Sequence, residues 1–170
     1  MARTIKRQVT LGLVIGSRAF FNGAPCQASR VETVAHMQRL GIRVITLPFD
    51  ATVNGAVQSI DDAKLYATYF RRHRDDIDGL VICLPNFGDE IAIAELVSRS
   101  GLNVPILLQA SNDEIDKVDV HPRRDAFCGK MSACNVLSQY GIRYSLTSEH
   151  TQRPESAGFR RDLRQFAATC

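Results

Sequence analysis

Five short, largely apolar runs alternate with helix-like segments, and this alternation constrains the fold more than any other feature. The runs lie at residues 9–15, 43–47, 80–84, 104–108 and 144–147. Near-continuous apolar runs of this length are typical of strands buried on both faces of a parallel sheet. Right-handed crossovers then predict an α/β fold: a doubly wound, mainly parallel five-stranded sheet with helices on both faces, flavodoxin-like or Rossmann-like.

Helices are predicted at about residues 27–40 and 59–74, then one that ends at Gly101, one that opens near residue 125, and a last one from residue 155. Gly41 ends the first helix as Gly101 ends the third, and Ser59 with Asp62 indicates a capped start of the second. The helical spacing predicts these buried positions: Ala28, Val31, Val34 and Ala35; Ile93, Leu96 and Val97; Ala133, Val136, Leu137 and Tyr140; Phe159, Leu163, Phe166 and Ala167.

The last helix keeps its apolar spacing up to Cys170, with no residue that typically ends a helix. We therefore expect an α/β N-terminal domain over residues 1–152, followed by a helix over 153–170 that leads towards a further domain. The two helical histidines, His36 and His73, are interpreted as surface or boundary residues.

Composition and charge disfavour several functional classes. Hydrophobic residues make up 45% and charged residues 23% of the chain, and the net charge is only +3. The basic clusters lack interleaved aromatic residues, so a solvated helix face is a better interpretation than a nucleic-acid site. The apolar run Leu11–Ile15 is too short for a signal peptide or a membrane span. Five cysteines without CxxC or zinc-ligand spacing indicate a reducing, cytoplasmic setting, with Cys83 and Cys134 as small core residues.

Polar residues gather where strands are predicted to end, the edge at which open α/β folds bind ligands. They are Ser17, Arg18 and Asn22; Asn86, Asp89 and Glu90; Gln109, Ser111, Asn112, Asp113 and Glu114; and Glu149 and His150. Loops are polar by default, so each of these residues could equally be plain surface. Arg18 stands out because it follows a buried strand and is flanked by Phe20 and Phe21, where it could bind a hydroxyl pair or an anion.

Residues 125–140 place a small polar turn at the entrance of a helix. Cys128 at that helix start could be a nucleophile, with His121 or His150 approaching in space, although a structural or substrate-contacting cysteine fits better. The run Cys128-Gly129-Lys130 is similar to the end of a P-loop but lacks its earlier glycine, and Met131 replaces Ser/Thr. Gly16 and Gly23 do not form GxGxxG, so dinucleotide binding is poorly supported.

Four segments resemble the N-terminal part of the L-fucose isomerase/L-arabinose isomerase family. They are residues 16–23 (Gly-Ser-Arg-Ala-Phe-Phe-Asn-Gly), 84–90 (Leu-Pro-Asn-Phe-Gly-Asp-Glu), 107–110 (Leu-Leu-Gln-Ala) and 125–132 (Asp-Ala-Phe-Cys-Gly-Lys-Met-Ser). The closing run 159–167 resembles the helix that enters the family's second domain. The order and spacing of these segments agree along the whole chain.

This resemblance implies an aldose–ketose isomerase that uses a divalent metal, usually Mn²⁺, and an enediol intermediate. It implies metal ligands and catalytic acids in later domains, so that this chain alone is inactive. Its own part would be to bind the sugar and to pack against other subunits of a homo-oligomer. The substrate-binding residues implied are Arg18, Phe21, Asn86, Phe87, Gln109, Asp125, Cys128 and Lys130, with Cys128 departing from a histidine at a matching position in arabinose-type enzymes.

Two other functions remain open from the residues alone. One is a free-standing flavodoxin-like module that binds a phosphorylated or anionic small molecule at the turn 128–130. The other is a small metal-dependent hydrolase that uses Asp89, Asp113 and His150.

Overall fold

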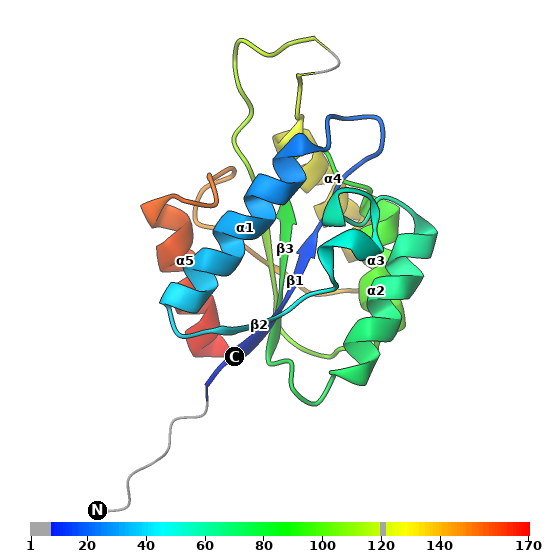
Figure 1. Ribbon diagram of the computed structural model, residues 1–170, viewed down its shortest axis with the longest axis vertical. Coiled ribbons are helices and arrows are strands. Elements are labelled where there is room, and N and C mark those ends of the chain that lie inside the picture. Colours follow the sequence, from blue (N-terminus) through cyan, green and yellow to red (C-terminus); the bar gives the residue numbers. More distant parts are fainter. Residues whose placement is uncertain (1–7, 120–121) are drawn as a thin grey trace, which may run out of the picture.

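A computed structural model describes residues 8–119 and 122–170 as an all-parallel five-stranded sheet with helices on both faces (Figure 1). The strands are β1 (Thr10–Ile15), β2 (Arg43–Ile45), β3 (Gly79–Leu84), β4 (Ile106–Ala110) and β5 (Ser145–Leu146). Their order across the sheet is β2-β1-β3-β4-β5. The predicted doubly wound fold is therefore confirmed, and its flavodoxin-like alternative matches this strand order.

The helices are α1 (Ala24–Arg39), α2 (Ile60–Arg72), α3 (Glu90–Ser100), α4 (Ala126–Gln139) and α5 (Ala157–Thr169), with short 3-10 turns η1 (Phe49–Ala51) and η2 (Val53–Gly55). Gly41 and Gly101 have positive φ angles of 74° and 68°, and the Ser59 hydroxyl accepts the backbone N–H of Asp62 at 3.2 Å. These predicted boundaries are confirmed. β4 begins at Ile106, two residues later than predicted, because Pro105 has no N–H to donate to a sheet.

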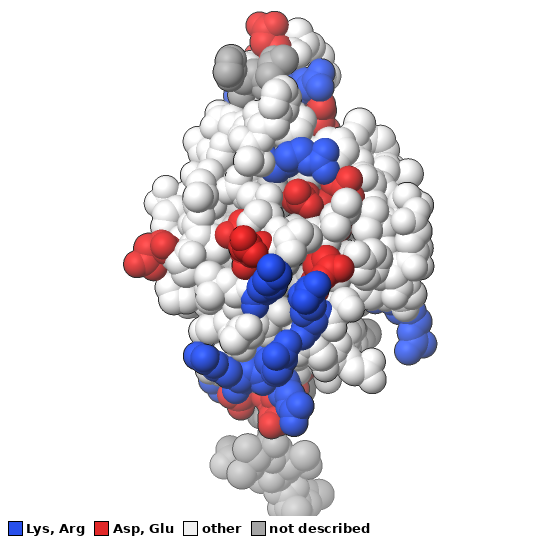
Figure 2. All heavy atoms as spheres, turned by 90° about the vertical axis from the view of Figure 1, so that its right-hand side faces the viewer, with Lys and Arg blue, Asp and Glu red and all other residues white. Residues whose placement is uncertain are grey.

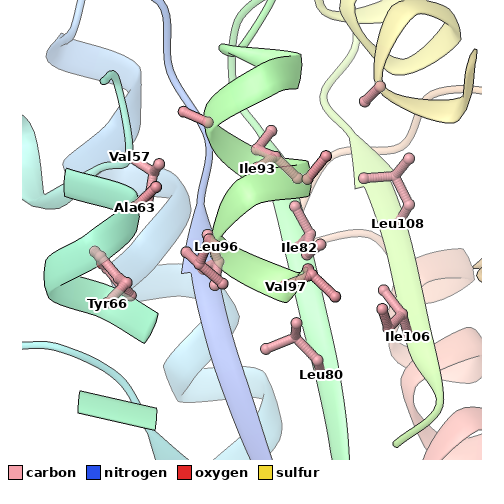
Figure 3. Close-up of a cluster of buried hydrophobic side chains, with 14 of the residues drawn as sticks. Val57, Ala63, Tyr66, Leu80, Ile82, Ile93, Leu96, Val97, Ile106 and Leu108 are labelled. Atoms are coloured by element: carbon pink, nitrogen blue, oxygen red, sulfur yellow. The ribbon is translucent and has the colours of Figure 1, made fainter. Parts of the chain in front are cut away.

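Two hydrophobic layers hold the helices to the sheet. On one face, Leu11 and Leu13 pack with Cys26 and Met37 of α1 and with three side chains of α5: Phe159, Leu163 and Phe166. On the other face, Leu80 and Ile82 pack with side chains of α2, α3 and α4 (Figure 3). The alternation of side chains along each strand produces both layers. Residues 153–170 thus include a helix that packs directly on this sheet.

The predicted buried face of α1 is wrong. Val31 is 61% exposed, whereas Ser29, Thr33 and His36 are buried together with Cys26 and Met37. The helix itself was predicted correctly, but a different face of it is buried, because α1 packs on the sheet partly through the small polar side chains Ser29 and Thr33. His36 is consequently a core residue, only 4% exposed, rather than a surface one.

The predicted faces of the later helices hold with smaller exceptions. Ala133 and Leu137 of α4 are buried, but Tyr140 is 42% exposed because its hydroxyl reaches outward to donate to Glu95 at 2.9 Å. Ile93, Leu96 and Val97 of α3 are buried as predicted. Cys83 is fully buried in the layer beside α1 and α5, and burial raises the pKa of its thiol to about 12. Cys134 is only half-buried, against the layer on the other face.

Charges of both signs cover the face that carries α2 and α3. Lys and Arg side chains gather towards one end of this face, with Asp and Glu side chains among them (Figure 2). Beyond the end of α2, Arg74 pairs with Asp75 at 3.5 Å, and Arg71 donates to the backbone carbonyl of Arg99 at 2.5 Å. Among the described residues, no helix is both long enough and apolar enough to cross a bilayer.

Candidate functional site

The loops after β1 and β3 lie side by side because these strands are parallel neighbours, with Ile15 opposite Cys83. Asn86 ties the two loops together. Its amide nitrogen donates to the Ser17 hydroxyl at 2.9 Å and to the Asn22 carbonyl at 3.3 Å. Its amide oxygen accepts the backbone N–H of Arg18 at 3.2 Å and of Gly88 at 3.1 Å. Asn86 is fully buried, so both ends of its amide are used to fix the two loops against each other.

Four side chains from these loops form what we call the Arg18 cluster: Arg18, Phe21, Phe87 and Glu90. The Arg18 guanidinium lies over the Phe87 ring, 4.5 Å from its centroid, and forms an ion pair with the Glu90 carboxylate. The rings of Phe87 and Phe21 stack in near-parallel planes, 6° apart, with centroids separated by 6.1 Å. The side chain of Arg18 is 35% exposed, so the cluster is accessible from solvent.

The position of Phe87 depends on the packing of α4. A Cβ atom at Gly129 would lie only 1.8 Å from the carbonyl oxygen of Phe87, so only glycine lets α4 approach this loop so closely. Gly88, the next residue of the loop, has a φ of 79°, which reverses the chain after Phe87. Gly129 therefore contributes to the site by letting the loop after β3, and with it Phe87, lie against α4.

The Arg18 cluster combines an aromatic surface with a donor and an acceptor. The stacked rings offer apolar area, the guanidinium offers N–H donors in a planar fork, and the carboxylate accepts hydrogen bonds. A small polar molecule with an apolar side could use all of these groups together. The cluster contains no thiol, hydroxyl or imidazole, and its one carboxylate, Glu90, is paired with Arg18. This composition suits binding and orienting a ligand.

The start of α4 is already capped within the chain. The Asp113 carboxylate accepts the backbone N–H of Ala126 at 2.7 Å and of Phe127 at 3.1 Å. Asp125 has a φ of 51°, and its carboxylate pairs with Arg123 at 2.7 Å. The helix N-terminus is therefore occupied by a protein carboxylate, which disfavours the predicted anion site at residues 128–130.

Lys130 is also unable to serve such an anion site. It is 3% exposed, and its Nζ donates to the Thr147 hydroxyl at 2.9 Å and to the His150 carbonyl at 2.8 Å. Burial lowers the pKa of this ammonium group. Lys130 thus secures the segment after β5 instead of facing solvent. Gln109 is fully buried as well, and its amide nitrogen donates to the Gln152 carbonyl at 2.5 Å.

The remaining chemical candidates make the following contacts within residues 8–119 and 122–170. Cys128 is exposed at the start of α4, and the His150 ring packs edge-on against Phe127, 5.7 Å between centroids. His121 lies outside the described residues. Asp89 caps α3 by accepting the N–H of Ala92 at 2.9 Å. Within residues 8–119 and 122–170, no group of three His, Cys, Asp or Glu side chains could hold a metal ion, so the hydrolase hypothesis is wrong for this part of the chain.

Two residues have roles in the structure that the sequence does not indicate. The sequence identifies Glu90 only as a polar residue after the third strand, whereas in the structure it is the ion-pair partner of Arg18. The adjacency of β1 and β3 would have suggested this pair, since it brings both loops to one edge. Asp113 was considered as a metal ligand, but it caps a helix thirteen residues later, for which the sequence has no local signal.

The comparisons with known proteins agree with this architecture. Among solved structures, the apo form of an NADH:FMN oxidoreductase superposes with a TM-score of 0.51 at 10% identity, over 95% of this chain and 90% of that one. At this identity the likeness supports the fold alone. No curated protein sequence matches the chain. The sequence profile described as "Fucose/sulfoquinovose isomerase, N-terminal domain" matches residues 12–170. The chain therefore belongs to the fucose/sulfoquinovose isomerase family, as its N-terminal domain.

Proposed function

We propose that this chain is the substrate-pocket and subunit-contacting domain of a metal-dependent aldose–ketose isomerase, an intramolecular oxidoreductase by reaction type. Membership of the isomerase family supports this proposal. The reaction would move a proton between C1 and C2 of the sugar through an enediol. The catalytic groups would lie outside these residues, and this chain would bind and orient the sugar.

The observation that carries the proposal is the Arg18 cluster at the carboxyl edge of the sheet. A sugar ring has an apolar C–H side that can pack on Phe87, and neighbouring hydroxyls that can accept from a guanidinium and donate to a carboxylate. Arg18 and Glu90 already lie next to each other beside the ring. A sugar hydroxyl pair that bridged them would replace their direct ion pair with hydrogen bonds to both side chains.

The eight predicted binding residues fall into three groups in this proposal. Arg18, Phe21 and Phe87 would touch the sugar, and Asp125 and the exposed Cys128 would lie at the rim. The other three, Asn86, Gln109 and Lys130, are buried and hydrogen-bonded to protein groups, so we propose that they position the pocket wall.

The metal would be held elsewhere. The Mn²⁺ ion implied by the family resemblance needs convergent carboxylates or imidazoles, and residues 8–119 and 122–170 offer no such group. No chemical step through the metal is therefore assigned to this chain. A neighbouring subunit of a homo-oligomer would complete the site. Phe20, which packs edge-on against Phe21 yet is 67% exposed, supports a partner surface beside the cluster. We place the enzyme in the cytoplasm, where its free thiols stay reduced.

The test combines binding and turnover on the 170-residue chain. The ¹⁵N-labelled chain is titrated with L-fucose, L-arabinose and sulfoquinovose while its amide resonances are followed. At least one sugar should shift the resonances of residues 17–22 and 86–90. Arg18→Ala and Phe87→Ala should weaken this binding. Arg74→Ala is the matched control, because Arg74 lies before the amino end of β3 and is paired with Asp75. It should not weaken sugar binding.

Two results would overturn the proposal. If none of the three sugars shifts these resonances, the Arg18 cluster is not a sugar wall. If the chain converts an aldose to a ketose in the presence of Mn²⁺, the proposed division of labour with another part of the enzyme is wrong. Absence of turnover together with localised binding is the expected outcome.

A further inference from the structure

A hollow lies on the α1 and α5 side of the sheet and shares no residue with the Arg18 cluster. It has a volume of about 180 Å³, is open to solvent on one side, and is lined by the first turns of α1, residues that follow β4 and the loop that leads into α5. These elements lie along one side of the sheet (Figure 1). The volume is below the roughly 300–1,000 Å³ of sites for drug-sized ligands, which restricts the hollow to a small molecule.

Two serines that line this hollow each have a buried hydroxyl group without a hydrogen-bond partner. Ser29 of α1 is 3% exposed and Ser111, directly after β4, is 2% exposed. The Oγ atom of each has no partner within the protein. Buried polar groups are nearly always paired, and an unpaired one is costly to maintain. Two such groups on different walls of one hollow indicate that a polar ligand completes them.

The charged groups of the hollow nearly balance. Glu32 of α1 lies against Glu155, and burial together with this neighbouring carboxylate raises the pKa of Glu32. Arg124 and Arg153 lie close to the same pair and act in the opposite direction. Arg124 is held in place by Glu114 at 2.9 Å. The lining thus combines two guanidinium groups with three carboxyl groups, one of which has a raised pKa, without a strong excess of either sign.

This lining selects against simple ions. A phosphate or another small anion would face three glutamates, and a metal cation would face two arginines. A hydroxyl group, in contrast, both donates and accepts, so it can pair with a serine hydroxyl, a guanidinium or a carboxylate alike. We propose that this hollow is a second ligand site that binds one small neutral polyol, such as an alditol or a single monosaccharide. The site goes beyond the proposed function, because it is independent of the Arg18 cluster.

The experiment follows ribitol binding to the ¹⁵N-labelled chain by amide resonances and by calorimetry. Ribitol has no carbonyl group and so cannot enter an aldose–ketose reaction. It should shift the resonances of Ser29, Glu32, Ser111 and Glu155. Ser111→Ala should weaken its affinity roughly threefold to tenfold, as expected for one lost hydrogen bond. Ser98→Ala, an exposed serine on α3, is the matched control and should leave the affinity unchanged.

Further variants and probes separate this proposal from its alternatives. Arg18→Ala should leave ribitol binding intact, so failure of the sugar-wall proposal would not remove this site. Glu32→Gln tests the carboxyl pair and should also weaken ribitol binding. Inorganic phosphate, glycine and Mg²⁺ are titrated separately. If any of these binds at the hollow more strongly than ribitol, the polyol assignment is overturned. It is also overturned if the Ser111→Ala and Glu32→Gln proteins stay folded by circular dichroism and bind ribitol like the parent.

Discussion

Replacing Gly129 with alanine should destabilise the protein, although the same change usually stabilises a helix. Gly129 lies inside α4, where alanine is favoured over glycine by about 1 kcal/mol. Its added Cβ, however, would sit 1.8 Å from the carbonyl oxygen of Phe87 and 2.4 Å from the carbonyl carbon. These are backbone atoms, which cannot turn aside as a side chain can. The helix and the loop would have to separate by more than an ångström.

The size of the effect follows from these opposing contributions. Overpacking of this kind costs typically about 1–3 kcal/mol, and contact with backbone puts this site at the upper end. After subtraction of the gain in helix propensity, the free energy of unfolding should fall by about 2 kcal/mol. For a domain of this size that corresponds to a decrease in Tm of about 4–8 °C.

Urea unfolding followed by circular dichroism measures this change directly. With a slope of about 2 kcal/mol per molar urea, the midpoint should move down by about 1 M. Asn135→Ala, at an exposed position of the same helix, is the control and should leave stability unchanged or raise it by a few tenths of a kcal/mol. A Gly129→Ala protein as stable as the parent, or more stable, would refute the close approach of α4 to Phe87.

Two other features give sharp predictions. Burial and the guanidiniums of Arg39 and Arg160 lower the pKa of His36. The unfolded chain therefore takes up this proton first, and the free energy of unfolding should decrease as the pH falls below about 6.5, then level off below the folded pKa. Urea unfolding across this range checks it, and an equally steep profile in His36→Gln would contradict it. Asp113→Ala should cost about 1 kcal/mol by uncapping α4. Thermal unfolding tests this, with exposed Asp116→Ala as control, and equal losses in both would contradict it.

The sequence predicted the elements well where the signal is local. All five strands are predicted within two residues at each end, because apolar runs and flanking glycines are local features. The capping pair at the start of α2 also lies within four residues of chain. The phase of α1 was missed because the period of a helix follows from its own sequence, whereas the face it buries depends on the surface it meets. Ser29 and Thr33 fit against the sheet where Val31 does not.

For the candidate site, too, some features could be predicted from the sequence and others could not. The position of Arg18 after a buried strand, and of Phe87 after another, could be predicted because parallel strands bring their carboxyl ends to one edge. The roles within the site could not. The sequence around Lys130 suggests, as one alternative, a turn that binds an anionic small molecule, but Lys130 is buried and bonded to groups about twenty residues away. Asp113 and α4 are similarly joined across a loop.

The sequence by itself determined the α/β architecture and the family resemblance, because strand and helix periodicity and short motifs are written in neighbouring residues. Only the tertiary structure decided which side chains meet. It pairs Glu90 with Arg18 and brings α4 close to Phe87 at Gly129. It also places Ser29 and Ser111 in the lining of one hollow. The physical reason is that such contacts depend on the order of strands and the closeness of packed backbones, which are properties of the whole sheet rather than of any segment.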